Sequence, residues 1–292
     1  NCINFYIKPS TIGKAAYIDY YPKTSFIKFK NASITVQDSV LKKLKIDRDW
    51  VLNKNTFYAY GELIDTSDVD TLYRNIYNPS TFTGIVFKES LERYGTKVKT
   101  ISRKKTFNKS YKKISNHLSK PLLHSAINLM NESDNLTAEL FVKSIGALDT
   151  LPGTWEVGLD SMKSFLAKEV LIDTSNIRLA DGSGVSRYNL TSAAQLNSLL
   201  RWMYNSKYKD DFISTLPSGG QRNSTLEKRL TNEGDLVKAK TGGLSGVRNL
   251  AGYLKSRKYG DVAFSILMNG YTDSSSRYTR VHDQIVKTVI YD

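Results

Sequence analysis

The chain contains little cysteine and histidine and no long apolar run. Its 292 residues include one cysteine, Cys2, which cannot form a disulfide within the chain and is either a free thiol or paired with a cysteine outside it. His117, His124 and His282 lack the spacing of zinc ligands, so we predict no metal and no other cofactor. No run approaches the roughly 18 apolar residues that cross a bilayer, so we predict no transmembrane segment.

Acidic residues are outnumbered by basic ones. The chain carries 42 Lys and Arg against 28 Asp and Glu, a net charge of +14. Basic chains often bind nucleic acid, and the basic run 103–113 includes two aromatic residues, as a phosphate-binding arm does. However, Lys and Arg occur along the whole chain, and no signature of a nucleic-acid-binding domain is found. We therefore predict no nucleic-acid partner, interpret the run as a solvated loop, and note that a basic protein facing anionic cell-wall polymers fits the charge equally well.

Two tripeptides carry the chemical signal: Ser133-Asp134-Asn135 and Lys240-Thr241-Gly242. Serine acyl-transfer enzymes that act on D-alanyl peptides and β-lactams combine S-x-x-K, S-x-N and K-T-G motifs. Each tripeptide alone is common by chance. The first, however, lies between two helix-like apolar runs, 122–130 and 136–145, and the second ends a strand-like segment. Together and in this order, they favour a functional site.

The S-x-x-K motif, which carries the nucleophile, has a strict structural requirement. In this chemistry, serine and lysine lie three residues apart on one helical face, partly desolvated, so that a neutral lysine can take the serine proton. The chain has five S-x-x-K matches, namely Ser25 with Lys28, Ser39 with Lys42, Ser102 with Lys105, Ser110 with Lys113, and Ser206 with Lys209.

None of the five matches fits that requirement. Ser25 and Lys28 lie in alternating, strand-like sequence, where positions three apart point to opposite faces. Ser39 and Lys42 would open a short helix on its solvated face, which keeps the lysine charged. The other three pairs lie in or beside lysine-rich segments. We therefore predict that the nucleophile lies outside this chain.

Three stretches carry a family resemblance: 131–146, 179–200 and 237–254. They resemble the D-alanyl-D-alanine carboxypeptidase/endopeptidase family, the class C low-molecular-mass penicillin-binding proteins. The opening 1–26 resembles the middle of that family's sequence, after its nucleophile motif. We therefore expect the C-terminal part of a longer enzyme, with the missing N-terminal part as a possible partner and Asn1 as a processing or cleavage end. The alternative hypothesis is a non-catalytic peptidoglycan-binding or scaffold homologue.

The organisation of the sequence changes near Lys120-Pro121. Before it, short alternating stretches at 15–20, 33–36 and 57–60 predict small β-units. After it, helices are predicted at about 155–168, with Thr154 as N-cap, and from the capping-box pattern that begins at Ser192. Strands are then predicted at 237–240, 247–254 and 262–268.

The predicted fold class is α+β. The resemblance implies a β-rich accessory (inserted-domain) region at 1–119. It also implies that 120–292 form the major part of a penicillin-recognising serine transferase domain of the β-lactamase/transpeptidase type, with helices on an antiparallel sheet.

The resemblance also implies a reaction, the hydrolysis of peptidoglycan stem peptides through an acyl-enzyme in the periplasm, and the binding of penicillin and other β-lactam antibiotics. Ser133 would relay a proton toward the leaving amine, and Asn135 would hold the base and the substrate amide. Lys240 would add positive charge that favours a neutral lysine base. Without its nucleophile, the isolated chain is expected to be inactive.

The remaining site residues are expected to bind substrate. Thr241 would hydrogen-bond the terminal carboxylate, Gly242 and Gly243 would let the substrate approach the backbone, and the N–H of Gly243 would donate to the oxyanion. Gly243 departs from the hydroxyl residue usual in the family, which predicts a weaker grip on the terminal D-alanine. Arg187, after the glycine-rich loop 181–184, would pair with a stem-peptide carboxylate.

Overall fold

A computed structural model gives the structure of the chain and describes residues 2–38, 41–102, 110 and 112–292. The chain divides into two compact units, Asn1–Ile114 and Ser115–Asp292. Both helices and sheets are present, which confirms the α+β class. Among the described residues, no helix combines the length and apolar character needed to cross a membrane.

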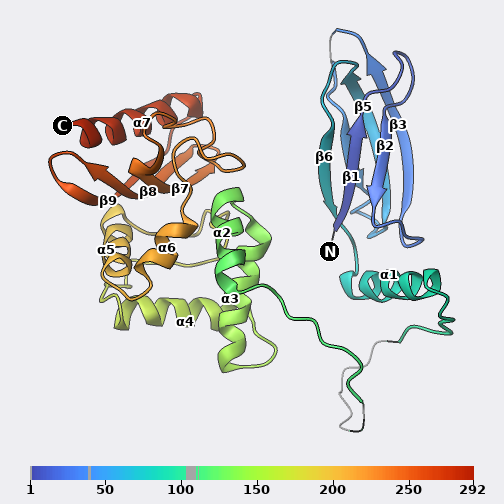
Figure 1. The fold of residues 1–292 in the computed structure, drawn as a ribbon, viewed down its shortest axis with the longest axis horizontal. Coiled ribbons are helices and arrows are strands. Elements are labelled where there is room, and N and C mark those ends of the chain that lie inside the picture. The colour runs from blue at the N-terminus through green and yellow to red at the C-terminus, as the bar shows by residue number, and fades with distance from the viewer. Residues whose placement is uncertain (1, 39–40, 103–109, 111) are drawn as a thin grey trace. The chain divides into compact units, whose positions relative to one another are not determined.

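The described residues of the first unit form two three-stranded sheets and one helix (Figure 1). In the first sheet, β1 pairs antiparallel with both β2 and β6. In the second sheet, the central strand β5 pairs parallel with β3 and antiparallel with β4. The elements are β1 (Cys2–Lys8), β2 (Tyr17–Tyr21), β3 (Lys28–Val36), β4 (Lys45–Arg48), β5 (Thr56–Ile64), β6 (Asp70–Asn75) and α1 (Pro79–Arg93).

The core of this unit follows from the alternation along its strands. Ile3, Phe5 and Ile7 of β1 are buried and belong to one cluster with Phe57 of β5. Because successive side chains of a strand point to opposite faces, Asn4, Tyr6 and Lys8 lie on the other face of β1. We call that side of the β2-β1-β6 sheet its outer face.

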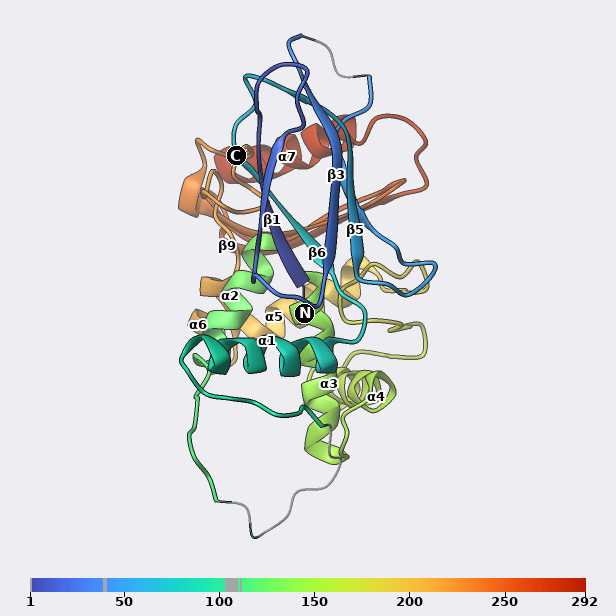
Figure 2. The same cartoon turned by 90° about the vertical axis from the view of Figure 1, so that its right-hand side faces the viewer.

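Helix α1 was not predicted within the β-rich region. It begins where the Asn78 side chain accepts from the backbone N–H of Thr81 and Pro79 occupies the first turn, both favourable at a helix start. Phe82 of α1 is buried in the core of the unit. The helix lies across one end of the strands (Figures 1 and 2).

The second unit places helices on both faces of an antiparallel sheet ordered β7-β8-β9. Helix α7 covers one face, and α5 and α6 lie on the other side (Figure 1). Its elements are α2 (Leu122–Glu132), α3 (Asn135–Asp149), α4 (Trp155–Lys168), α5 (Ala193–Tyr204), α6 (Lys209–Thr215), the 3-10 turn η1 (Gly234–Leu236), β7 (Val237–Leu244), β8 (Val247–Ser256), β9 (Gly260–Asn269) and α7 (Ser275–Tyr291).

The helix starts predicted for this unit are confirmed. The Thr154 hydroxyl accepts from the N–H of Val157 at the start of α4. Ser192 and Gln195 form both hydrogen bonds of a capping box at the start of α5. These local contacts satisfy backbone donors that a helix leaves unpaired at its N-terminus.

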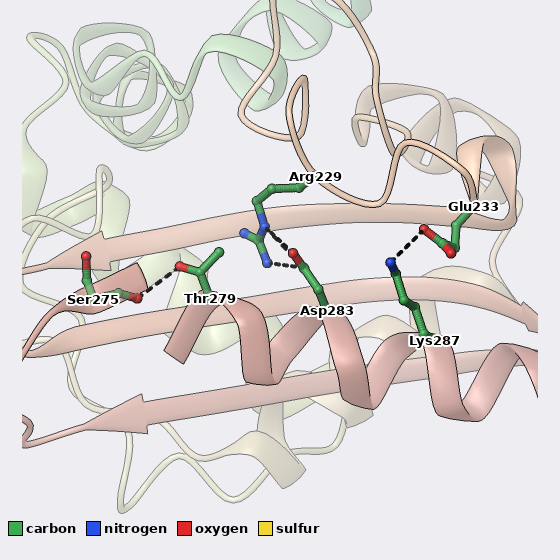
Figure 3. Close-up of polar contacts among 6 residues, drawn as sticks. All are labelled: Arg229, Glu233, Ser275, Thr279, Asp283 and Lys287. Carbon is green, nitrogen blue, oxygen red and sulfur yellow. Dashed lines mark hydrogen bonds and ion pairs between the residues drawn. The ribbon is translucent and has the colours of Figure 1, made fainter. Parts of the chain in front are cut away.

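Helix α7 was also not predicted, and it covers the sheet. His282, Val286 and Ile290 are buried at a spacing of four residues, which places them on one face of the helix. Polar contacts fix the helix to the loop before β7: Arg229 binds Asp283 at 2.7 Å, and Lys287 lies 3.9 Å from Glu233 (Figure 3). The arginine contact uses two guanidinium nitrogens, Nε and Nη2.

Candidate active site

Ser133 lies at the tight junction between α2 and α3. It is the C-terminal cap of α2 and has left-handed backbone angles, φ 59° and ψ 49°. The next residue, Asp134, caps α3 by accepting from the N–H groups of Leu136 and Thr137. A helix end and a helix start on consecutive residues fix the backbone on both sides of the Ser133 side chain. Asn135, the first residue of α3, is exposed at the same junction.

Lys240 brings the two tripeptides together. Its Nζ donates to the Ser133 hydroxyl at 2.8 Å and to the Thr241 carbonyl oxygen at 2.7 Å. The hydroxyl and the ammonium group come from positions 107 residues apart. Their contact therefore depends on packing the α2–α3 junction against the sheet.

Burial lowers the pKa of Lys240 from 10.5 to about 8. The cause is desolvation, which disfavours the charged form of an amine. Lys240 is therefore partly neutral near pH 8 and can exchange a proton with a neighbouring hydroxyl more readily than an ordinary lysine. A lysine of this kind beside a serine hydroxyl can serve a proton relay.

Strand β7 has an open edge from Lys240 onward among the described residues. It is the terminal strand of its sheet, and the N–H of Ala239 points away from β8, since it donates to the carbonyl of Pro217 at 3.0 Å. Residues two apart on a strand share that direction, so the N–H groups of Thr241 and Gly243 also point outward. The open edge thus presents backbone donors to an extended peptide or to an oxyanion.

The space for a side chain at position 243 is limited by the neighbour of Gly243 across the hairpin. Gly243 pairs with Arg248 in the β7–β8 register, and a Cβ built at Gly243 would lie 2.1 Å from Nη1 of Arg248. The other terminal nitrogen of that guanidinium, Nη2, donates to the hydroxyl of Ser275 on α7 at 3.0 Å. The space that a hydroxyl side chain would use at position 243 is therefore occupied by an arginine. At Gly242, by contrast, the nearest atom to a built Cβ is 3.4 Å away.

The glycine-rich loop is held by α3. The carboxylate of Glu139 accepts from the N–H groups of Gly182 and Ser183 at 3.1 and 3.0 Å. Burial alone would raise the pKa of Glu139, but hydrogen bonds from Ser183 and Gly182 lower it below its ordinary value. At the end of the loop, Nη2 of Arg187 donates to the carbonyl of Ser245 at 2.7 Å, which connects the loop to the β7–β8 turn.

A cavity of about 640 Å³ lies between the helices and the sheet of this unit. Lys240, Thr241, Gly242 and Arg187 are among its polar lining. Most of its surface is apolar, with Leu196, Leu199 and Leu200 of α5, Phe212 of α6 and Leu267 of β9 as examples. Gly243 and Asn135 are not among the residues that line it.

The hydroxyls of Ser25 and Ser206, which belong to two of the five S-x-x-K matches, form hydrogen bonds in the described structure. The Ser25 hydroxyl donates to Glu89 of α1 at 2.6 Å, and Ser25 lies in a turn before β3, so its prediction as a strand residue was wrong. The Ser206 hydroxyl donates to the carbonyl of Met203 at 2.8 Å.

The other three matches fall on or beside residues outside the described ranges. Ser39 is one of them, and the backbone that follows at 41–43 forms bends and a bridge rather than the predicted helix. Most of the basic run 103–113, including Lys105, also lies outside the described residues, so its interpretation as a solvated loop stays a prediction.

The fold of this chain, with helices on an antiparallel sheet, is similar to that of a penicillin-binding protein. A solved structure of penicillin-binding protein 4 (DacB) from Haemophilus influenzae in complex with a β-lactam matches with a TM-score of 0.77 and 22% identity, covering 100% of this chain and 70% of that chain. The model of the D-Ala-D-Ala carboxypeptidase 3 (S13) family matches residues 1–289. The chain belongs to that family, as its sequence predicted.

Two curated relatives agree with the family assignment. The D-alanyl-D-alanine carboxypeptidase of Actinomadura sp. (strain R39) is 30% identical over 275 residues, which are 91% of this chain and 50% of the relative. The D-alanyl-D-alanine carboxypeptidase DacB of Haemophilus influenzae is 34% identical over 168 residues, 54% of this chain and 34% of the relative. The chain thus spans about half the length of the Actinomadura relative.

Sequence reasoning missed two residues that shape the site. Glu139 carries no motif of its own, and its role appears only once α3 and loop 181–184 are packed together. Arg248 had a usable signal. Once Ser245-Gly246 is taken as the turn of a hairpin, counting back along both strands sets Arg248 opposite Gly243.

Proposed function

We propose that this chain is part of a serine-type D-Ala-D-Ala carboxypeptidase or endopeptidase that cleaves peptidoglycan stem peptides through an acyl-enzyme and binds β-lactams. The observation that carries the proposal is the 2.8 Å hydrogen bond from Lys240 to Ser133, which joins the S-x-N and K-T-G motifs. Family membership and the penicillin-recognising fold support the same reaction.

The proposed reaction assigns one proton path. A serine outside this chain attacks the carbonyl of the penultimate D-alanine and passes its proton to a neighbouring lysine. Ser133, polarised by Lys240, relays that proton to the departing amine, and water then hydrolyses the acyl ester. Asn135 lies beside this relay and would hold the lysine base and the substrate amide.

Substrate recognition is assigned to the open edge of β7. The stem peptide would lie along that edge, with the Gly243 N–H as one oxyanion donor and the Thr241 hydroxyl on the terminal carboxylate. Arg187 lines the adjoining cavity and would meet a second carboxylate of the peptide.

We place the nucleophile-bearing segment in the 640 Å³ cavity. The predominantly apolar lining calls for an apolar occupant, since burying such a surface is favourable. The lining also includes Lys240 and Thr241, so the polar end of a helix in this cavity would lie next to the proposed proton relay. In the described structure, the Ser25 hydroxyl bonds to Glu89 and the Ser206 hydroxyl to the Met203 carbonyl, so neither is paired with a lysine.

A periplasmic or other cell-envelope location follows from the proposed substrate. The net charge of +14 suits a protein that works among anionic cell-wall polymers.

Labelling with a fluorescent penicillin tests the proposal. The 292-residue chain is expected not to be labelled, whereas the product of the whole reading frame that contains it should be labelled on a serine of an S-x-x-K segment. The full-length protein should release D-alanine from a D-Ala-D-Ala peptide, and Ser133→Ala should slow release by about 10²–10⁴-fold, the usual worth of positioned proton transfer.

The outcomes separate the hypotheses. Covalent labelling of the 292-residue chain would show that its nucleophile is present after all. A reading frame without an S-x-x-K segment before Asn1, or a full-length protein that neither labels nor hydrolyses, would leave the peptidoglycan-binding or scaffold alternative.

A further inference from the structure

The outer face of the β2-β1-β6 sheet carries four tyrosines in register. The pairs Asn4–Tyr21 and Asn4–Tyr73 form one row across the three strands, so two rings flank a central amide. Directly paired residues of an antiparallel ladder point to the same side. The next rows add Tyr6, paired with Asp19 and Thr71, and then Lys8, paired with Tyr17.

These rings are exposed rather than packed. Between 40% and 62% of the surface of Tyr6, Tyr17, Tyr21 and Tyr73 is accessible, although the other side of the same strands is buried in the core. The solvent side of an antiparallel sheet is usually polar, and a contiguous set of exposed aromatic rings is a common sign of a binding surface. The tyrosine rings and the amide therefore call for a ligand with both apolar and hydrogen-bonding faces.

Most of the net positive charge of the chain lies in this first unit. Residues 1–114 contain 21 Lys and Arg against 10 Asp and Glu, so they hold +11 of the total of +14. The other 21 Lys and Arg lie in residues 115–292, so basic residues do occur along the whole chain, but there acidic residues nearly balance them. On the face itself, Nζ of Lys8 lies 4.5 Å from the centre of the Tyr17 ring, and Asp19 is paired with Lys23. Lys8 is thus the cation that remains for an anionic ligand on these rows.

We propose that this outer face binds an extended polysaccharide that carries acidic peptides, namely the glycan strand of peptidoglycan. The C–H faces of sugar rings stack on tyrosine rings, and the hydroxyl and N-acetyl groups at their edges match Asn4 and the tyrosine hydroxyls. The positive unit complements the carboxylates of the attached stem peptides and, once an amidase has removed these, the lactyl carboxylates of the glycan itself. Tyr21 and Tyr73 lie two strand spacings apart, about 10 Å, which suits stacking on separate sugars of one strand.

The face shares no residue with the proposed catalytic site. The identity of the polymer rests on the proposed function, because a stem peptide is attached to a glycan. The binding itself needs no nucleophile and is measured without turnover, so it can fail or succeed independently of penicillin labelling.

Sedimentation with purified peptidoglycan sacculi tests the proposal on the 292-residue chain. A matched pair of variants separates the two sheets of the unit: Tyr21→Thr with Tyr73→Thr on the outer face, and Tyr58→Thr with Tyr60→Thr on β5 of the other sheet. Tyr58 and Tyr60 are also exposed and lie beside Lys30 and Lys45, so the control removes similar rings from a similar charge setting. Thermal unfolding checks that each variant is folded. If a double variant is not folded, the single variants Tyr73→Thr and Tyr73→Phe are compared in its place.

We expect binding to depend on the aromatic rings of the outer face and not on those of the other sheet. Removing Tyr21 and Tyr73 should weaken binding at least about tenfold, whereas the β5 pair should bind like the unchanged chain. Tyr73→Phe should retain most of the binding because it keeps the ring. Binding should persist on sacculi whose stem peptides have been removed by an amidase, because the glycan is the proposed ligand.

Three results would overturn the proposal. One is equal binding by both double variants. Another is loss of binding when the stem peptides are removed, which would assign recognition to peptide. The third is binding to double-stranded DNA that is as tight as binding to sacculi and that moderate salt abolishes in all variants alike. That result would show that charge alone causes the binding.

Discussion

Lys240 has a pKa of about 8, close to neutral pH, where a residue of a proton relay must both gain and lose a proton. Because burial is the cause of its fall to about 8, the Ser133 hydroxyl should matter little for that value. We expect the side-chain resonance of Lys240, followed by NMR in lysine-labelled protein, to titrate near pH 8 both in the unchanged chain and in Ser133→Ala. A midpoint near 10.5 in either protein would contradict the burial argument.

The same shift has a consequence for stability. The folded-state pKa of Lys240, about 8, is below its ordinary value of 10.5. Between these two values the unfolded chain binds more protons at this residue than the folded chain does, so the contribution of Lys240 to stability rises with pH across that window. Below pH 8 both states are protonated, and this pH dependence ends.

Two glycines on neighbouring strands should respond differently to a methyl group. At Gly243 the obstructing atom is the end of the Arg248 side chain, which can move. At Gly252 the obstructing atoms are the Lys238 carbonyl at 2.1 Å and the Ala239 Cα at 2.6 Å, which belong to the backbone. We expect Gly243→Ala to change the free energy of unfolding by less than about 1 kcal/mol and Gly252→Ala to lower it by about 3 kcal/mol or more.

Urea unfolding of the two glycine variants measures this difference. A similar loss in both would show that Arg248 is fixed as firmly as backbone. If Arg248 does move, Gly243→Ser should also weaken its bond to Ser275, and a crystal structure of that variant would show the displaced guanidinium.

At the scale of elements, the α2–α3 junction depends on one carboxylate. Asp134 accepts from Leu136 at 3.1 Å and from Thr137 at 3.2 Å and so begins α3. We expect Asp134→Ala to lower the free energy of unfolding by about 1 kcal/mol, while Asp134→Asn keeps most of the stability, because asparagine caps helices nearly as well as aspartate. Thermal unfolding of both variants checks this, and equal losses would indicate that charge rather than capping stabilises the junction.

The elements that were predicted and those that were missed differ in a physical way. Helices α4 and α5 carry local signals, a capping residue followed by periodic apolar positions, and were predicted from them. Helix α1 contains several β-branched residues and only one buried side chain, so its pattern resembles the strands around it. The parallel pairing of β3 with β5 joins segments separated by β4 and has no local signature.

The same limit applies to the candidate site. The S-x-N and K-T-G motifs named Ser133 and Lys240, because their order and surroundings resemble a known family. Sequence did not predict that the Arg248 side chain would fill the space beside Gly243. That contact depends on the register of a hairpin and on where α7 begins, and both are set by packing.

At the scale of the whole chain, the junction between the units should be the first place that a protease cuts. Residues 112–121 form no helix or strand, and Ile114 is 99% exposed. Exposed backbone outside regular structure is the preferred substrate of proteases. Under brief trypsin treatment, we expect a stable C-terminal fragment that begins at Lys113 or Ile114, as read by N-terminal sequencing and mass spectrometry. Earlier cleavage inside the β7–β9 sheet or α7 would contradict the division into two units.

The backbone of Ser133 has a consequence for any effort to improve this protein. A serine with φ 59° is in a conformation that glycine and asparagine adopt at lower cost. A library screened for thermal tolerance alone would therefore enrich glycine or asparagine at position 133 and discard the hydroxyl that Lys240 contacts. Selection for thermal tolerance and selection for activity therefore favour different residues at position 133. A screen must measure turnover as well as stability if the serine is to be retained.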